Sequence, residues 1–202
     1  MKKRVLGIMM AVMVGMVTMG CGKDVNNTVG NEVEETVSIG SAIEAMNNIW
    51  DNYEGEKFSI MGGDYANMTD GVPGAMLVAD DPATDEDESA AIKFLVLVPE
   101  DQIAKVDDGA SMVHAMNQNT FTAGVFHLVN AEDKEAFAKA YVENAQNNMW
   151  MCGIPDRVVV MSLNDSYVLT LFGADDILKE CQNTATTLYP GAKIVAEGVI
   201  GQ

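Results

Sequence analysis

The second half of the chain alternates short apolar runs with segments whose apolar residues recur every three or four positions. Four runs rich in Val, Leu and Phe predict strands: residues 121–129, 157–163, 166–172 and 193–196. The helical spacing predicts helices over residues 130–149 and 175–189, the first capped by Asn130. Asn164 and Asp165, between two strand runs, predict a hairpin. The order βαββαβ predicts a ferredoxin-like α+β fold, in which two helices pack on one face of an antiparallel sheet.

The first half is predicted to contain the same kinds of element. A helix is expected over residues 42–53, where Ser41 can cap the first turn and Glu44 completes a capping box. Residues 54–74 hold five Gly and one Pro and predict a loop with a short extended piece at 57–61. The next predicted elements are two strands that form a long hairpin, followed by a helix: residues 75–79, 92–98 and 100–117.

The two halves also share a short sequence, which indicates a degenerate internal repeat. Asn-Asn-Ile-Trp at 47–50 and Asn-Asn-Met-Trp at 147–150 both fall near the C-terminal end of a predicted helix. The predicted elements from residue 42 to the strand at 121–129 follow the order αββαβ, and those from Asn130 onward follow the same order, which predicts two degenerate repeats that pack together. The corresponding domain halves are residues 41–120, an α+β half, and 121–202, the ferredoxin-like half. Residues 167–172 support this arrangement, because they are apolar on both faces of a strand and need cover from a second layer.

Residues 1–20 carry the pattern of an export signal. Three basic residues at positions 2–4 precede an uncharged, mostly apolar run over residues 5–18. This run is shorter than the roughly 20 residues that a membrane-spanning helix needs. Thr-Met-Gly-Cys at 18–21 resembles the lipobox of bacterial lipoproteins, in which the Cys receives diacylglycerol and becomes the new N-terminus. Cys21 is therefore the expected anchor in the cell membrane, and cleavage after Gly20 to give a secreted protein is the alternative.

Charge limits the partners of the exported chain. The sequence has 12 Lys or Arg against 30 Asp or Glu, and cleavage before Cys21 leaves 9 basic and 30 acidic residues, a formal charge of −21. Such a chain lacks the basic surface that displaces counterions from phosphates, so nucleic acid is excluded as a partner. Anionic lipid also repels it, so the predicted membrane attachment depends on acyl chains at Cys21. Residues 21–40 are polar and acidic and predict a flexible tether.

Four features together resemble an uncharacterised family of Gram-positive surface lipoproteins with an α+β domain of unknown function. They are the lipobox Cys, the polar spacer, the α+β domain, and the run Tyr-Val-Leu-Thr-Leu-Phe-Gly at 167–173 before a helix. The resemblance implies a location on the cell surface and an α+β fold, and it brings no catalytic residues. Some relatives carry a bile acid transporter label. The sequence predicts no bundle of transmembrane helices to form a transport path, so this label is not carried over.

Acidic residues are densest between the two strands of the predicted long hairpin. Asp80, Asp81, Asp85 and Asp87 belong to a stretch of six carboxylates in nine residues. Hard cations such as Ca²⁺ take about six to eight oxygen ligands, which a flexible acidic loop can partly supply. The residue order of an EF-hand loop is absent from the stretch. A solvated hairpin tip is the first interpretation, and weak Ca²⁺ binding at these four residues is the alternative.

Two cysteines remain once Cys21 carries lipid. Cys152 follows one predicted helix and Cys181 lies within the next. Outside the membrane such a pair can oxidise, provided that the two Cα atoms lie within reach of each other. The sequence leaves both a Cys152 to Cys181 disulfide and two free thiols open.

The sequence contains none of the common nucleophile, phosphate-loop or zinc-protease motifs. His114 and His127 lack a Cys or a second His at ligand spacing, so both are expected to be structural, and no cofactor is predicted. Four methionines fall at helical core positions and are expected to pack in the interior, and a soft apolar ligand pocket is the alternative: Met46, Met112, Met116 and Met149.

These observations favour a non-catalytic protein that binds a small ligand or an envelope partner at the cell surface. The candidate binding residues are aromatic, and the two Trp at matching positions would flank a cleft between the two halves: Trp50, Tyr53, Tyr65 and Trp150. One alternative is a hydrolase that works with carboxylates and a Tyr, marked by acidic residues that converge from distant segments. The other is a structural accessory of an envelope complex, marked by an exposed apolar patch.

Overall fold

The computed structural model of the chain describes residues 38–78 and 86–201. Within them lie eight strands: Ile60–Gly62 (β1), Thr69–Asp70 (β2), Gly74–Met76 (β3), Val106–His114 (β4), Phe121–Leu128 (β5), Arg157–Ser162 (β6), Tyr167–Gly173 (β7) and Lys193–Val199 (β8). Five α-helices and one 3₁₀-helix accompany them: Ala42–Asp51 (α1), Glu86–Phe94 (α2), Glu100–Ile103 (α3), Ala131–Asp133 (η1), Lys134–Asn147 (α4) and Asp175–Leu188 (α5). The α+β class predicted from the sequence is confirmed.

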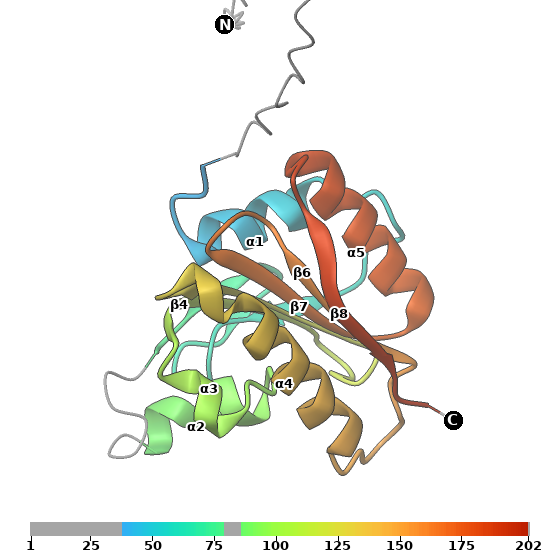
Figure 1. Cartoon of the computed structure of the whole chain (residues 1–202). Coiled ribbons are helices and arrows are strands. Elements are labelled where there is room, and N and C mark those ends of the chain that lie inside the picture. Colours follow the sequence, from blue (N-terminus) through green and yellow to red (C-terminus); the bar gives the residue numbers. More distant parts are fainter. Residues whose placement is uncertain (1–37, 79–85, 202) are drawn as a thin grey trace, which may run out of the picture. The chain divides into compact units, whose positions relative to one another are not determined.

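All eight strands belong to one antiparallel sheet (Figure 1). Its order is β2-β1-β4-β5-β7-β6-β8, and β3 also pairs with β4. The predicted hairpin is present as β6 and β7, in which Val158 lies opposite Phe172. The pairing of β4 with β5 joins the first half of the chain to the second within the same ladder. The two halves therefore extend one sheet instead of forming two stacked sheets.

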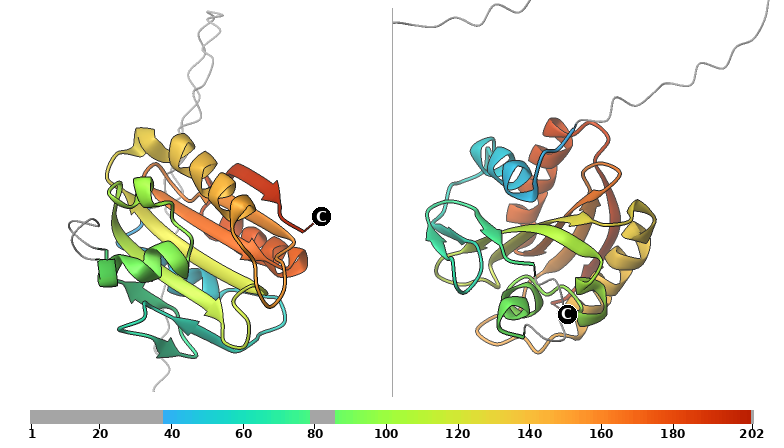
Figure 2. Two further views of the ribbon diagram at one scale, coloured as in Figure 1. Left: turned by 90° about the horizontal axis from the view of Figure 1, so that it is seen from below. Right: turned by 90° about the vertical axis from the view of Figure 1, so that its left-hand side faces the viewer.

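Helices cover both faces of this sheet (Figure 2), because its central strands are apolar on both sides. In β7, Leu169 and Leu171 pack into a core with α1 and α5, whereas Val168 and Phe172 pack into a second core with α2, α3 and α4. Every residue of β7 is buried. The second layer that this strand requires is thus supplied by α1 together with α5.

The ferredoxin-like sheet predicted from the βαββαβ order is wrong in two respects. The last strand, β8, pairs with β6 and not with β5, whose free edge is occupied by β4. In addition, α4 and α5 lie on opposite faces. The connections β5–α4–β6 and β7–α5–β8 both cross the sheet in the same direction, toward β8. Their first strands, β5 and β7, run antiparallel. Right-handed connections from antiparallel strands must then place their helices on opposite faces.

The predicted internal repeat is also not found. The predicted strand at 92–98 is the end of α2 and a buried turn, and most of the predicted helix at 100–117 is β4, so the long hairpin does not form. Trp50 packs against the core of α1 and α5, and Trp150 packs against the core on the other face. The shared Asn-Asn-apolar-Trp sequence therefore does not mark equivalent positions.

Of the two helix caps that the sequence predicts, the cap at Ser41 is present and the cap at Asn130 is not. The Ser41 hydroxyl accepts a hydrogen bond from the Glu44 amide at 3.2 Å, as expected for a cap of α1. Asp108 in β4 adds a second acceptor for this end, 2.6 Å from the Ala42 amide. Asn130 precedes η1, but its side chain makes no capping hydrogen bond. The start of α1 is therefore fixed to β4 as well as by its own cap.

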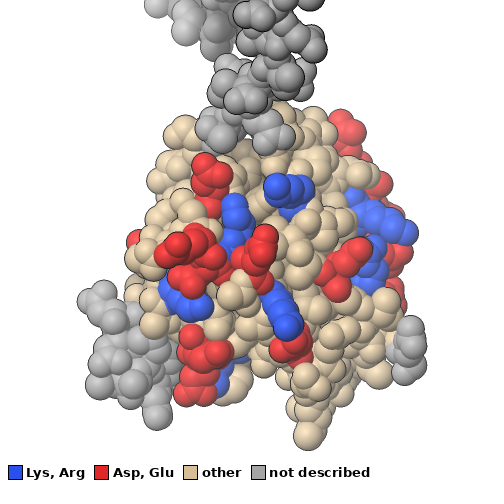
Figure 3. Space-filling view, in the orientation of Figure 1, with Lys and Arg blue, Asp and Glu red and all other residues tan. Residues whose placement is uncertain are grey.

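Acidic and basic side chains lie next to one another across the middle of the face seen in Figure 3, with no broad basic area on it. This distribution agrees with the excess of carboxylates in the sequence. Within residues 38–78 and 86–201, none of the helices has the length and apolar character needed to cross a bilayer.

Candidate functional site

An open pocket with a volume of about 440 Å³ lies between the segment that follows α1 and the first turns of α5. We call it the aromatic pocket. It is lined by residues of three separate parts of the chain: Tyr53, Gly55, Glu56, Lys57, Phe58, His114, Asp176, Ile177, Lys179 and Glu180. Its volume lies within the range of about 300–1,000 Å³ that is usual for small-molecule sites.

The pairing of β1 with β4 places the aromatic side chains of this pocket together. Ile60 in β1 lies opposite His114 in β4, and the Ala115 amide donates to the Ser59 carbonyl at 2.9 Å. This register brings Phe58 next to His114, and the rings of these two residues stack with their centroids 5.2 Å apart. The site therefore depends on a pairing between segments more than fifty residues apart in the sequence.

Phe58 is the centre of an aromatic cluster, of which Tyr53, Phe58 and His114 line one wall of the pocket and the other rings pack against that wall. Its ring makes edge contacts with the rings of Trp50 at 5.3 Å, Tyr53 at 6.1 Å and Phe121 at 5.3 Å. Trp50 in the last turn of α1 and Tyr53, two residues past its end, stack at 5.6 Å. Such mutual contacts hold aromatic rings in defined orientations. The wall is thus a preformed apolar surface.

Lys57 lies over this wall. Its ammonium nitrogen is 4.0 Å from the Trp50 ring centroid and 5.5 Å from the Tyr53 ring centroid. The same nitrogen donates a hydrogen bond to the Trp50 carbonyl oxygen. Loss of hydration lowers the pKa of the Lys57 ammonium, and the charge of Asp51 opposes this shift. The contact is a cation–π interaction supported by a backbone acceptor.

The remaining wall carries carboxylates. Glu56, Asp176 and Glu180 line the pocket, and none of them takes part in an ion pair within the described part of the chain. Lys179 is held by Asp175 at 2.6 Å. Burial raises the pKa of the Tyr53 phenol to about 12, so this side chain stays neutral at physiological pH. The pocket therefore combines an apolar aromatic wall with an excess of negative charge.

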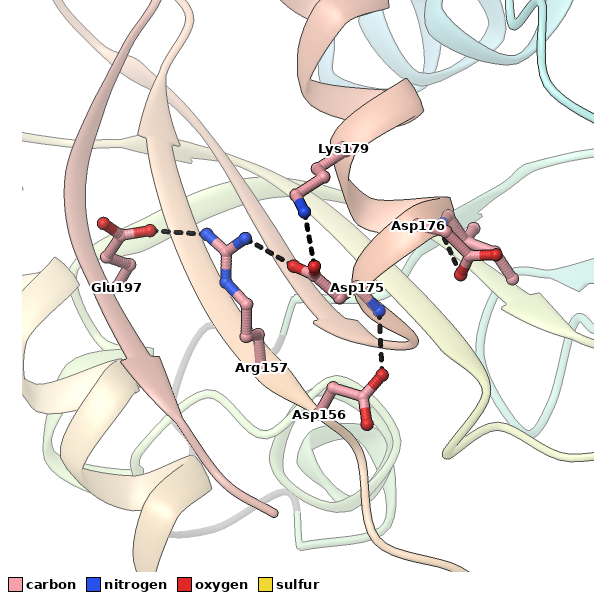
Figure 4. Close-up of polar contacts among 7 residues, drawn as sticks. Asp156, Arg157, Asp175, Asp176, Lys179 and Glu197 are labelled. Atoms are coloured by element: carbon pink, nitrogen blue, oxygen red, sulfur yellow. Dashed lines mark hydrogen bonds and ion pairs between the residues drawn. The ribbon is translucent and has the colours of Figure 1, made fainter. Parts of the chain in front are cut away.

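A network of charges holds the start of α5, which supplies the acidic wall (Figure 4). Arg157 of β6 donates to Asp175 at 2.6 Å and to Glu197 of β8 at 2.5 Å. The Asp156 carboxylate accepts from the Asp175 amide at 3.0 Å. The hydrogen bond from Lys179, followed by that from Arg157, lowers the pKa of Asp175. This network fixes the first turn of α5 to two strands of the sheet.

Replacing Asp175 by Asn is expected to destabilise the fold in a pH-dependent manner. Because the folded state lowers the pKa of Asp175, its stabilising contribution is present above the unfolded value of about 4 and is lost as the pH falls through the folded value. Urea unfolding of wild type and D175N should therefore differ at pH 7 and converge near pH 2. Asp176→Asn, also in the first turn, is the matched control and should show a smaller difference at pH 7. An equal loss at both pH values would contradict the role of the charge.

The other two candidate aromatic residues lie at a second cavity. Tyr65 and Trp150 line a groove of about 510 Å³ on the face of α2 and α4, which we call the methionine groove because Met61, Met68, Met116 and Met151 contribute to it. The Trp150 ring packs on Phe172 at 5.2 Å. Trp50 and Trp150 therefore do not flank a common cleft, which corrects the sequence prediction. His114 lines both cavities.

Two of the four methionines predicted for the interior are exposed instead. Met46 and Met112 are buried in the core with α1 and α5. Met116 and Met149 are each 86% exposed, because Met116 follows β4 in a turn and Met149 follows the end of α4. Neither residue belongs to the helix that its spacing predicted.

The two cysteines of the described residues are both free thiols. Cys152 is exposed at the methionine groove, whereas Cys181 is buried in the core with α1 and α5. Burial raises the pKa of the Cys181 thiol to about 12. Of the two alternatives left open by the sequence, the structure holds the one without a disulfide.

Several predicted sites fall outside the described residues. Cys21, Asp80, Asp81 and Asp85 belong to this group, and Asp87 lies in α2 with its side chain undescribed. Among the described residues, no group of three or more His, Cys, Asp and Glu side chains is arranged to hold a metal ion. The predictions for lipidation and Ca²⁺ binding therefore remain predictions.

His127 takes part in a local polar contact away from both cavities. Its Nδ1 atom lies 2.5 Å from Asp107 Oδ1, and its ring lies 4.8 Å from that of Tyr167. These neighbours satisfy one nitrogen of the imidazole and pack one side of its ring. Both contacts are the kind expected of a structural histidine.

Comparisons of the chain with protein-family models, with curated proteins and with solved structures find no match. The fold and the site together define the chain as an α+β protein whose two-sided sheet supports an open, aromatic-walled pocket.

Proposed function

We propose that the chain is a lipid-anchored protein of the cell envelope that binds a small organic ligand in the aromatic pocket without transforming it. The observation that carries this proposal is the preformed wall around Phe58, which faces an open cavity beside three carboxylates without ion-pair partners in the described chain. Aromatic rings with a few convergent polar groups are typical of ligand sites.

The groups of the pocket suit binding in distinct ways. The rings of Tyr53, Phe58 and His114 line the pocket and offer apolar surface for the body of a ligand. Glu56 and Glu180 offer acceptors from opposite sides, one from the segment after α1 and the other from α5. Because the aromatic cluster and the α5 network are each internally supported, little side-chain order has to be gained when the ligand binds.

The proposed location rests on the N-terminal sequence. The lipobox-like residues 18–21 favour acylation of Cys21, and residues 21–40 favour a tether between membrane and domain. More than one acyl chain is needed for lasting membrane attachment, and a diacylated cysteine meets that need without a basic surface. A small ligand would then be captured outside the cytoplasmic membrane.

A second candidate function is a hydrolase that works with carboxylates and a Tyr. It is favoured by the convergence of Glu56 with Asp176 and Glu180 from a distant segment, beside the neutral phenol of Tyr53. A hydrolase of this kind would release a product from its bound molecule, whereas a binding protein would return the molecule unchanged.

Native mass spectrometry of the chain extracted from the membranes of an exporting Gram-positive host tests the proposal. The expected spectrum shows an acylated chain that begins at Cys21, with extra mass that is lost on denaturation. Phe58→Ala should lose this extra mass, because it removes the centre of the aromatic wall. Phe94→Ala, at the other cavity, is the matched control and should keep it.

Three results would contradict the proposal. A chain without acyl lipid would remove the anchor, and bound mass that is equal in F58A and wild type would place the ligand elsewhere. A released ligand that differs from the captured one by the addition of water would replace the binding function by the hydrolase.

A further inference from the structure

Two cationic side chains line the aromatic pocket, Lys57 and Lys179, and Lys57 is the one that lies on an aromatic ring. The Lys57 ammonium lies over the ring of Trp50, the aromatic side chain with the strongest attraction for cations, and it donates to the Trp50 carbonyl. We propose that Trp50 and Tyr53 form a receptor site for a primary alkylammonium group, and that Lys57 is a resident occupant which an external amine displaces. This inference rests on the proposed binding function and names the chemical class of its ligand.

The recognition groups select a primary ammonium over other cations. The ring faces of Trp50 and Tyr53 attract any organic cation by electrostatics. The Trp50 carbonyl additionally accepts an N–H bond, which a quaternary ammonium cannot donate. A ligand that reproduces the contacts of Lys57 therefore needs an N–H donor at the end of a flexible alkyl chain.

The charges around the site favour an external cation. Glu56, Asp176 and Glu180 line the same pocket as Lys57. Glu180 and Asp176 act on the Tyr53 phenol, and Asp51 acts on the Lys57 ammonium. Lys179, the other cation of the lining, is engaged by Asp175. A concave surface with an excess of one charge raises the local concentration of the opposite charge. Amines are therefore drawn to the pocket before they compete with Lys57.

Lys57 is positioned so that it can leave. It is an exposed residue in a segment without helix or strand, between Asp51 at the end of α1 and Ile60 at the start of β1. None of the ion pairs of the described chain includes it. Its movement would break one hydrogen bond and the ring contacts, which the arriving ammonium remakes. The exchange would leave the aromatic wall intact.

The test is a titration of n-butylammonium followed by Trp50 fluorescence in the full chain. Trp150 is replaced by Phe throughout, because the chain has two Trp and Trp150 lies at the other cavity. Lys57→Met removes the resident competitor and is expected to tighten butylammonium binding about tenfold, the factor for a site that is one-tenth free in wild type. Lys93→Met is the matched control, since Lys93 lies over Phe94 at 5.4 Å and pairs with Glu100. It should leave the affinity unchanged.

The specificity of the site is tested with matched probes. Tetramethylammonium and neutral n-butanol should bind K57M at least about fivefold more weakly than butylammonium, a difference of roughly 1 kcal/mol, as expected for the loss of one hydrogen bond or of the charge. In the K57M background, Tyr53→Leu should reduce the butylammonium affinity. A polyamine and a lysine-containing tripeptide then compare the two sources of the ammonium group, and tighter binding of either one identifies the source.

The outcomes separate this inference from the proposed function. If K57M binds butylammonium no tighter than wild type, or binds butanol equally well, the ammonium site is wrong. In that case, a ligand that is lost from F58A in native mass spectra would leave the proposed function standing with another ligand class. If F58A and wild type also carry the same mass, both proposals fail.

Discussion

Replacing Phe126 by Ala is expected to lower the free energy of unfolding by about 3–5 kcal/mol. Phe126 in β5 is fully buried in the core with α2, α3 and α4. Its ring also fills the space over two glycines, since a Cβ placed at Gly109 or Gly124 would lie 3.3 Å or 2.6 Å from it. The truncated side chain would leave a cavity over the centre of the sheet, and the two glycines have no side chains with which to fill it.

Chemical denaturation in urea measures this loss. Phe94→Ala is the matched control, because Phe94 is 59% exposed and its removal should change the free energy of unfolding by no more than about 0.5 kcal/mol. A loss below about 1 kcal/mol in F126A would show that the core over β4 and β5 can collapse around the missing ring.

Replacing Gly74 by Ala is expected to destabilise the edge formed by β1, β2 and β3, at a cost of about 3 kcal/mol, the upper end of the range for overpacking. A Cβ at this position would lie 2.4 Å from the Gly63 nitrogen and 2.5 Å from the Gly62 carbonyl carbon. These are backbone atoms, so no side-chain rotation relieves the clash. Because the segment that carries Phe58 leads directly into β1, the same change should weaken ligand binding in the aromatic pocket.

Hydrogen exchange by mass spectrometry locates this effect. Peptides over residues 58–76 should exchange faster in G74A, while those over β6 and β7 remain protected. Gly191→Ala is the matched control, because a Cβ there has no neighbour within 4 Å. Uniformly faster exchange across the whole sheet would contradict the local nature of the effect.

The second half of the chain was predictable because its local signals agree with its packing. The runs of β6 and β7 flank Asn164, whose side chain accepts from the Ser166 and Tyr167 amides in the turn. The apolar residues of α5 match its buried side, which includes Leu178 and Cys181. Sheet order was not predictable in the same way. The edge of β5 is taken by β4, and β4 lies in a segment for which the sequence predicts a helix.

In the first half of the chain, the secondary-structure predictions were wrong where a segment is buried on both sides. Such burial removes the alternation of apolar and polar residues from the sequence. Residues 109–113 of β4 are all buried, with Met112 in one core and Val113 in the other. The resulting spacing imitates a helix, since a strand buried on both faces shows no alternation. Residues 92–98 form an apolar run around a turn in which Leu97 adopts a φ of 58°. Periodicity cannot distinguish such a buried turn from a strand.

The sequence predicted only those parts of the site whose residues lie close together along the chain. Trp50 lies in the last turn of α1 and Tyr53 in the turn that follows it, three residues on, so their proximity follows from local spacing. Phe58 and Lys57 follow within a few residues, and this density of aromatic residues around a lysine was the available signal. His114 and Glu180 reach the pocket only through the β1 to β4 pairing and the packing of α5. No local pattern reveals either arrangement.

The most direct test of the aromatic pocket as a ligand site is ¹⁹F NMR of the chain with 4-fluorophenylalanine at position 58. A second sample carries the label at position 94, beside the methionine groove. Titration of butylammonium into the Lys57→Met variant is predicted to shift the resonance at position 58 in a saturable manner and to leave that at position 94 unchanged. A resonance at position 58 that does not move, or equal shifts at both positions, would contradict the account.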